Sequence, residues 1–296
     1  MIPLPSALAL GWAILVLGGA PASIQDGPSP MSRAEAAEVL KKALAEARRA
    51  DGPEKEAEAL RRAADQVARG RPENFLVADA LRGPADAPAA EPSRQAERWR
   101  SAVSEALEVL EFEVEEESPL PDGFPKPTPL GEIAVQSYPV YRAARADLGD
   151  GDDGAFMRLF GHITTRGISM TAPVEMNYSR GEKEGSRKVA MSFLYRNTGQ
   201  GTLGGDQVKV VDVDKLTAVS LGLRGYPNEE RVKEARGRLE AWLASHAKEY
   251  RAAGPVRTLI YNSPFLPAKR QFYEVQIPVE PGDPAKPPGD AAAESR

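Results

Sequence analysis

The sequence predicts an α+β fold in which a distorted antiparallel barrel with two flanking helices follows an α-helical N-terminal region. Three observations support this fold class. Helical spacing of apolar residues dominates up to about residue 117, and strand-like alternation dominates from residue 131 onwards. The second part of the chain also reads as one strand–helix–strand–strand (βαββ) unit used twice. Two such units would form one sheet with two helices packed on it.

Composition and charge exclude several classes of protein. The 296-residue chain is 42% hydrophobic and 27% charged, which is typical of a globular protein. Its formal net charge of −5 argues against nucleic-acid binding, because a nucleic-acid surface needs basic residues to neutralise phosphates. The chain contains no cysteine, which excludes disulfides, cysteine nucleophiles, thiolate metal sites and thiolate-ligated haem.

The N-terminal segment predicts export. Residues 7–17 form an apolar core that is short for a bilayer span, and small residues at Ala20 and Ala22 predict cleavage after Ala22. We therefore expect a signal peptide over residues 1–22 and a periplasmic, extracytoplasmic or secreted protein with no stable membrane insertion after cleavage. An uncleaved anchor is the alternative, because no Lys or Arg precedes the apolar core.

A turn-rich spacer over residues 23–30 precedes a helical region over residues 31–117. Ser32 with Glu35 forms a capping-box pattern at the start of the first helix. A second helix ends at Gly70, and a third is predicted from Ser93 to about Glu117, after a Pro/Ala-rich linker at 83–93. Since the apolar faces of the first two helices are thin, this hairpin must pack on something larger, and it is the expected docking element for any protein partner. We interpret the acidic residues 115–117 as a solvated face.

Residues 118–130 are rich in Pro and Gly and predict a linker to the barrel domain, which we place at residues 131–280. Residues 281–296 have the composition of a disordered tail. Within the barrel, the segments Ile168–Val174 and Tyr261–Phe265 each contain a proline and stand between a predicted helix and a predicted strand. We expect these two proline segments to be structural counterparts in the two units.

Few residues have the character of a catalytic or metal site. The glycine pattern from Gly199 to Gly204 is followed by a strand rather than a helix, so we interpret it as a hairpin loop and not a nucleotide site. The only histidines are His162 and His246. His246 falls in the apolar stripe of the helix predicted at about 229–251, which fits either a hydrogen-bonded core residue or a ligand or acid/base in a pocket. Two histidines without clustered carboxylates argue against a zinc site, and no catalytic residue is predicted.

A possible ligand surface comes from apolar residues with basic neighbours. Four apolar residues recur on one face of the first predicted barrel helix: Phe156, Leu159, Phe160 and Ile163. Four more alternate along the first proline segment and the strand that follows it: Met170, Ala172, Val174 and Met176. Plain core packing is one interpretation, and the wall of a flat apolar pocket is the other. The basic residues Arg158, Arg166, Lys269 and Arg270 stand near the expected rim, where they would pair with carboxylates of an amphipathic ligand.

Several of these segments resemble the SOUL haem-binding proteins. The helix Ala155–Ile163 followed by Ile168–Met176 resembles the family's helix-plus-turn hallmark. The strand at 189–195, the opening segment at 135–142, and residues 261–265 followed by 274–278 resemble the same family. The resemblance covers about residues 131–280 and leaves residues 23–128 outside it.

The resemblance implies a twofold-pseudosymmetric barrel, related in shape to GyrI-like multidrug-sensing domains, that binds haem or another tetrapyrrole in an apolar surface pocket. The pocket candidates are then the eight apolar residues above together with His246 and Phe265, and the four basic residues would hold propionates. His246 and His162 are candidate iron ligands, and the motif assigns neither.

The function expected on this basis is that of an exported, non-enzymatic haem- or tetrapyrrole-binding protein. One alternative is a GyrI-like sensor of another amphipathic small molecule. A second is an interaction module that docks a protein through residues 31–117, and a third is an enzyme that uses His246 as a base.

Overall fold

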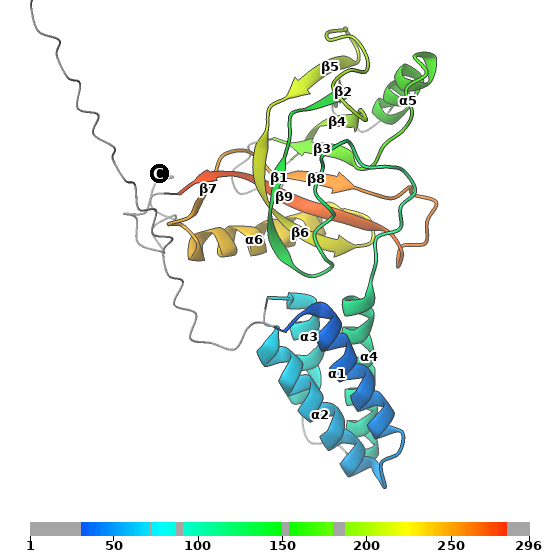
Figure 1. The fold of residues 1–296 in the computed structure, drawn as a ribbon, viewed down its shortest axis with the longest axis vertical. Helices are drawn as coiled ribbons and strands as arrows, with labels where there is room; N and C mark the ends of the chain where they lie inside the picture. Colours follow the sequence, from blue (N-terminus) through cyan, green and yellow to red (C-terminus); the bar gives the residue numbers. More distant parts are fainter. Residues whose placement is uncertain (1–30, 72, 87–90, 150–153, 180–186, 283–296) are drawn as a thin grey trace, which may run out of the picture. The chain divides into compact units, whose positions relative to one another are not determined.

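The computed structural model describes residues 31–71, 73–86, 91–149, 154–179 and 187–282 (Figure 1). The predicted signal peptide, the spacer and nearly all of the predicted tail lie outside the described residues. Within the described part of the chain, no helix is both long enough and apolar enough to cross a membrane.

The described N-terminal residues form a bundle of helices: α1 (Arg33–Ala47), α2 (Pro53–Gly70), α3 (Phe75–Asp86) and α4 (Pro92–Glu111). The capping box predicted for α1 is confirmed, since Ser32 accepts from the Glu35 amide while the Glu35 carboxylate accepts from the Ser32 amide. The thin apolar faces of α1 and α2 pack on each other and on α4, where Trp99 is buried. The hairpin therefore finds its packing partner within the bundle.

Helix α3 was not predicted. Its first turn is capped by Asn74, whose side-chain oxygen accepts from the Val77 amide, and Pro84 lies near its end. The Pro and Ala residues at 83–93 predict a linker, whereas in the structure α3 extends to Asp86.

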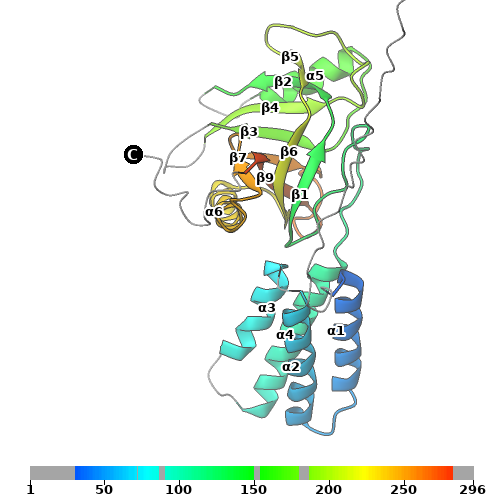
Figure 2. The same ribbon diagram turned by 60° about the vertical axis from the view of Figure 1, so that its left-hand side comes forward.

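In the described part of the chain, nine strands form one antiparallel sheet (Figures 1 and 2). They are β1 (Ile133–Tyr138), β2 (Tyr141–Asp147), β3 (Val174–Tyr178), β4 (Lys188–Leu194), β5 (Lys209–Val213), β6 (Leu216–Arg224), β7 (Tyr250–Ala252), β8 (Arg257–Ile260) and β9 (Phe272–Pro281). The order is β1-β6-β9-β8-β3-β4-β2-β5, with β7 paired to β9. The sheet is curled, and the predicted α+β class is confirmed.

The strand order also confirms the duplication. The halves β5-β2-β4-β3 and β1-β6-β9-β8 meet where β3 pairs with β8. In chain order the two units are β1-β2-helix-β3-β4 and β5-β6-helix-β7-β8-β9, so the second has the short strand β7 in addition. The leading strand of each unit joins the other half: β1 pairs with β6, and β5 pairs with β2. This exchange ties the two units into one sheet and adds one strand to the βαββ unit that the sequence predicted.

The two faces of the sheet are covered differently. Helix α5 (Ala155–Thr165) packs on β2 and β4, while α6 (Glu229–Ser245) packs on β6, β7 and β9. Both helices contribute to the same apolar core on the first face. Helix α6 ends at Ser245 and not near residue 251, because the chain turns at its cap, His246, and enters β7.

Residues 112–130, which we call the strap, cover part of the second face. Helix α4 ends at Glu111, so the prediction of a helix to about Glu117 is wrong. The Phe112 ring stacks on Phe272 with centroids 5.9 Å apart, and the Phe124 ring meets Tyr138 and Tyr141 edge-on at 5.1 and 5.2 Å. The stretch predicted to be a linker is therefore packed on the barrel through its apolar side chains.

The two proline segments are not structural counterparts, and that prediction is wrong. The first lies between α5 and β3, whereas the second lies between β8 and β9. They share a different feature, because both bind the strap. The Ala172 amide donates to the Pro119 carbonyl at 3.0 Å, and the Ser263 amide and hydroxyl donate to the Glu117 carboxylate at 2.7 and 2.8 Å. Glu117 is thus held by hydrogen bonds and is not simply part of a solvated face.

Candidate functional site

Helix α5 presents aromatic side chains at the protein surface. Phe156 is 42% exposed and Phe160 is 44% exposed, and their rings are nearly parallel with centroids 6.2 Å apart. Met157 lies next to Phe156 in the chain and is 64% exposed. The edge of Phe156 also rests on the buried Phe193 at 5.1 Å, which holds the ring in place from below. We call Phe156, Met157 and Phe160 the α5 aromatic surface.

The other apolar candidates are divided among different surroundings. Leu159, Ile163 and Met176 are buried in the core of the first face, and Met170 and Val174 pack against it partly buried. Ala172 belongs to the cluster on the second face. The predicted alternation fails at Ala172 because β3 begins only at Val174 and residues 168–173 before it are not part of a strand.

Phe265 and His246 are not part of the α5 aromatic surface. Phe265 is 94% exposed in the connection between β8 and β9, and His246 caps the C-terminal end of α6. In the described structure α5 packs on β2 and β4, whereas His246 follows the helix on β6, β7 and β9. The α5 aromatic surface therefore takes its residues from one helix.

Two of the four basic candidates accompany this surface. Arg158 donates from Nη2 to the Asp147 carbonyl at 3.2 Å, and Arg166 donates from Nη1 to the His162 carbonyl at 3.3 Å. Both lie on or directly after α5. Lys269 is exposed in the β8–β9 connection, and the nearby Arg270 forms an ion pair with Glu115 of the strap. Arg270 therefore helps to hold the strap.

Both histidines are engaged by neighbouring groups. His162 is 9% exposed, and its Nε2 lies 2.9 Å from the hydroxyl of the buried Tyr195. Burial, and then the charge of Arg166, lower the pKa of His162, which favours the neutral imidazole. The His246 ring stacks on Trp242 at 3.8 Å, and its Nδ1 donates to the Trp242 carbonyl at 2.8 Å.

These observations test how far the residues fit a haem. The parallel phenyl rings fit a flat porphyrin face, and Arg158 and Arg166 fit its carboxylates. The histidine on α5 is buried and hydrogen-bonded, so it does not fit as an iron ligand at this surface. Within the described residues, no group of three His, Cys, Asp or Glu is placed to hold a metal ion. The surface therefore fits the ring of a tetrapyrrole better than its metal.

A buried charged cluster on the second face was missed by the sequence reasoning. Arg257 is 4% exposed and Glu175 is 6% exposed, with Nη1 of Arg257 lying 3.2 Å from the carboxylate. Tyr141 donates its hydroxyl to Glu175 at 2.7 Å, and Arg257 donates from Nε to Gln276 at 3.0 Å. Burial alone lowers the pKa of Arg257, but Glu175 and the tyrosines outweigh it and raise that pKa.

The cluster continues to Glu274, where the strap reaches it. Glu274 is fully buried and accepts from the Thr128 amide at 2.5 Å and from the Tyr261 hydroxyl at 2.9 Å. Gly222 pairs with Glu274 in the sheet, and a Cβ atom on Gly222 would collide with the Thr128 and Pro129 carbonyls. The strap thus closes over this carboxylate. A sequence signal existed, since Glu274 and Gln276 alternate with apolar residues in a strand that proved to be buried on both faces.

The surroundings of Glu274 predict a pH dependence. Burial raises its pKa above the ordinary 4.5, although the bonds from Thr128 and Tyr261 act in the opposite direction. Between pH 4.5 and the raised pKa, the folded protein binds more protons than the unfolded chain, so the free energy of unfolding falls as the pH rises. We expect Glu274→Gln to remove this decline. Urea unfolding at several pH values above 4.5 would measure it, and parallel pH curves for the two proteins would contradict it.

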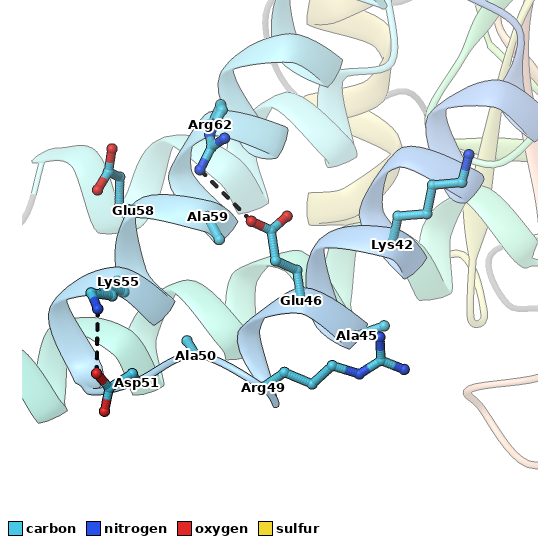
Figure 3. A pocket seen from close by; sticks show the side chains of 10 residues that line it. All are labelled: Lys42, Ala45, Glu46, Arg49, Ala50, Asp51, Lys55, Glu58, Ala59 and Arg62. Carbon is cyan, nitrogen blue, oxygen red and sulfur yellow. Dashed lines mark hydrogen bonds and ion pairs between the residues drawn. The ribbon is translucent and has the colours of Figure 1, made fainter.

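A groove also lies where the C-terminal part of α1 turns into the N-terminal part of α2 (Figure 3). Its charged side chains are partly paired, Glu46 with Arg62 at 3.9 Å and Asp51 with Lys55 at 3.4 Å. The three apolar residues that line it, Ala45, Ala50 and Ala59, are all alanines. Ligand pockets are mainly apolar with a few convergent polar groups, and this groove has the opposite character.

About half of this chain is similar to several solved structures. No curated protein matches the chain. The C-terminal domain of EcmrR is 16% identical, with 51% of this chain and 98% of that one covered and a TM-score of 0.40. A hydrolase from Listeria innocua is 13% identical, with coverages of 52% and 94% and a TM-score of 0.40. The structure of SAV2435 bound to tetraphenylphosphonium is 11% identical, with coverages of 50% and 94% and a TM-score of 0.33.

The family comparison is the decisive one. Residues 130–278 match the family model described as SOUL heme-binding protein, which agrees with the barrel domain expected at 131–280. The match contains α5, the α5 aromatic surface and the buried cluster around Glu175, Arg257 and Glu274. The model spans half of the chain, and the protein therefore belongs to the SOUL heme-binding protein family.

Proposed function

We propose that this protein is an exported, non-enzymatic binding protein for haem or a related tetrapyrrole, which it holds on the α5 aromatic surface. The observation that carries the proposal is the parallel, half-exposed pair Phe156 and Phe160. Part of the apolar surface of these two rings remains exposed to water. Burying that surface would stabilise the fold by about 25 cal/mol for each Å² of apolar area. Large exposed apolar patches are often binding sites, and the adjacent exposed side chains Phe156, Met157 and Phe160 support that interpretation here.

The cations beside this surface support a ligand with carboxylates. Arg158 stands two residues after Phe156, and Arg166 directly follows α5. Both arginines donate to backbone carbonyls, and Arg166 also donates to the Thr165 hydroxyl, so neither charge is neutralised by those bonds. Guanidinium groups pair well with carboxylates, which a tetrapyrrole carries as propionates.

The engaged histidines indicate how the ligand would be held. Because His162 is hydrogen-bonded to Tyr195, it is not available to bind the iron. The affinity for the ligand would then come mainly from ring stacking and from the two arginines. Haem would supply its iron chemistry when bound, but these residues bind and orient the ring and not the metal. Export rests on the apolar segment at residues 7–17.

The test is a titration of the purified protein with haemin, followed through the Soret band. We expect saturable binding that weakens about tenfold or more in the double variant Phe156→Ala/Phe160→Ala. Each aromatic stacking pair contributes about 0.5–1.5 kcal/mol beyond the apolar area that it buries, and the double variant removes both rings. Phe265→Ala is the matched control, since Phe265 is exposed but lies outside α5. Protoporphyrin without metal should bind about as tightly as haemin.

Three results would count against the proposal. Micromolar haemin that leaves the Soret band unshifted would exclude haem binding. Equal losses in Phe265→Ala and the double variant would place the ligand elsewhere, and a loss confined to His246→Ala would identify that histidine as a ligand.

The alternative GyrI-like role, binding of another amphipathic small molecule, would use the same surface. It predicts stabilisation by varied apolar ligands without a preference for porphyrins.

A further inference from the structure

The connection between β8 and β9 holds an apolar side chain out in the solvent. It comprises residues 261–271 and projects beyond the paired ends of the two strands (Figure 1). Phe265 is 94% exposed, more than any other large apolar side chain of the described residues. Residues 264–268, which we call the apolar tip, are all apolar, and all of them except Leu266 are exposed.

Hydrogen bonds within the connection fix the conformation of the apolar tip. The buried Gln271 donates from Nε2 to the Leu266 carbonyl at 2.7 Å. The Pro267 carbonyl accepts from the Arg270 amide at 2.8 Å and from the Gln271 amide at 3.2 Å, and the Leu266 amide donates to the Ser263 carbonyl at 3.2 Å. Two of the five residues of the tip are prolines, which have no amide N–H to leave unpaired. A segment that enters an apolar phase needs its backbone polar groups satisfied internally in this way.

The strap braces the base of the connection. Besides the bonds from Ser263 to the Glu117 carboxylate, the side-chain amide of Asn262 donates to the Glu115 carbonyl at 2.7 Å, and Arg270 pairs with the Glu115 carboxylate. An unbraced loop would fold Phe265 back onto the protein, because removing apolar surface from water is favourable. The fold therefore keeps this side chain outward.

Basic residues follow the apolar tip directly. Lys269 and Arg270 come next in the chain, and residues 264–270 contain no carboxylate. Arg270 is engaged by Glu115, whereas the exposed Lys269 has no hydrogen-bonding or ion-pair partner within the described part of the chain. Aromatic side chains enter the boundary between lipid headgroups and acyl chains, and a nearby lysine is attracted to anionic headgroups. The tip combines these two features.

We propose that the apolar tip contacts the surface of a phospholipid membrane that contains anionic lipids. Phe265 enters the boundary of the acyl chains, and the Lys269 ammonium lies among the phosphates. A bilayer suits a protruding side chain, because lipids rearrange around it, whereas a protein partner would need a pocket of matching shape. One phenylalanine and one lysine give a weak and reversible contact. The contact therefore orients a chain that is close to a membrane and does not anchor it.

A fluorescent label on the tip of the full chain tests the proposal. Because the chain has no cysteine, Ala268→Cys creates a single labelling site for the polarity-sensitive dye NBD. We expect NBD emission to rise when vesicles of phosphatidylcholine and phosphatidylglycerol are added. The same label in Ala241→Cys, on an exposed position of α6, should not respond. At lipid concentrations well below saturation, adding Phe265→Ala to the labelled chain should reduce the rise about tenfold, because the burial of one phenylalanine is lost.

A charge variant tests the role of the headgroups. Lys269→Gln should reduce the rise about fivefold with anionic vesicles and leave it nearly unchanged with pure phosphatidylcholine, because one lysine near an anionic surface contributes about that factor. Lys248→Gln is the matched control, since Lys248 is exposed just before β7, which pairs with the opposite end of β9. Circular dichroism of each variant verifies that it is folded.

Four results would overturn the proposal. They are no emission rise with either kind of vesicle, equal rises from the labels at positions 268 and 241, an undiminished rise in Phe265→Ala, and equal effects of the two lysine variants. The first would leave a pocket of a protein partner as the occupant of the tip. None of these results depends on the α5 aromatic surface, so they are independent of tetrapyrrole binding.

Discussion

Replacing Arg257 by methionine is expected to lower the free energy of unfolding by about 3–5 kcal/mol. The substitution leaves the Glu175 carboxylate buried without its cation, and only Tyr141 and Asn177 remain as donors to it. Arg257 is itself fully enclosed, so no solvent replaces it. Urea unfolding followed by circular dichroism would measure the loss. A buried ion pair need not stabilise a fold, but breaking one is costly because a charge stays behind.

Arg251→Met is the matched control for this prediction. Arg251 also lies on a strand and pairs with Glu280 at 3.2 Å, but both side chains are largely exposed. Exposed pairs contribute about 0–1 kcal/mol, so this variant should unfold almost as the wild type does. Adding Glu175→Gln to Arg257→Met should recover part of the lost stability by removing the unpaired charge. Equal effects of Arg257→Met and Arg251→Met would contradict the buried pairing.

Removing the strap is expected to destabilise the barrel far more than removing the helical bundle alone. A chain that begins at residue 112 keeps the strap, whereas a chain that begins at residue 131 loses it. Without the strap, the partial burial of Phe112 and Phe124 is lost, at up to about 1.5–3 kcal/mol for each side chain. The Glu274 carboxylate also loses its hydrogen bond from the Thr128 amide, and leaving a buried acceptor without this bond costs about 1–3 kcal/mol more. At its upper limit the sum falls within the range of a typical domain's whole stability, about 5–15 kcal/mol.

Thermal unfolding of the two shortened chains would test this. We expect a cooperative transition for the chain from residue 112, lowered by the lost contacts of Arg71 with Glu132 and of Asn74 with the Leu130 carbonyl. The chain from residue 131 should unfold at a much lower temperature or without a cooperative transition. If the two chains have equal midpoints, the strap is a dispensable linker as the sequence suggested. Binding studies of the barrel alone therefore need residues 112–130.

Much of the fold was accessible from sequence because it depends on local patterns. The capping box at Ser32 and Glu35, the helical spacing before Gly70 and the alternation in β9 act over a few residues. The duplication was also visible, since a repeated order of helix and strands is a property of the chain itself. The exchange of β1 and β5 between the two halves was not visible in the sequence, because the strand with which a leading strand pairs depends on the tertiary fold and not on a local pattern.

The candidate site was predicted less completely for the same reason. The apolar stripe of α5 was correct as a pattern, but only the packed structure separates the buried Leu159 and Ile163 from the exposed Phe156 and Phe160. Whether these exposed rings bind a tetrapyrrole stays a prediction. The sequence predicts His246 on the second helix and groups it with the α5 residues as a pocket candidate, and the structure places it at the C-terminal cap of α6.

By itself, the sequence determined the class of fold, the repeated unit and the resemblance of residues 131–280 to the SOUL family, which the family model confirms for residues 130–278. Tertiary structure alone decided that both proline segments bind the strap and that Glu175, Arg257 and Glu274 share one buried cluster. The physical reason is sequence distance. Thr128 and Glu274 meet across 146 positions, and no local propensity or periodicity records a contact between groups that only folding brings together.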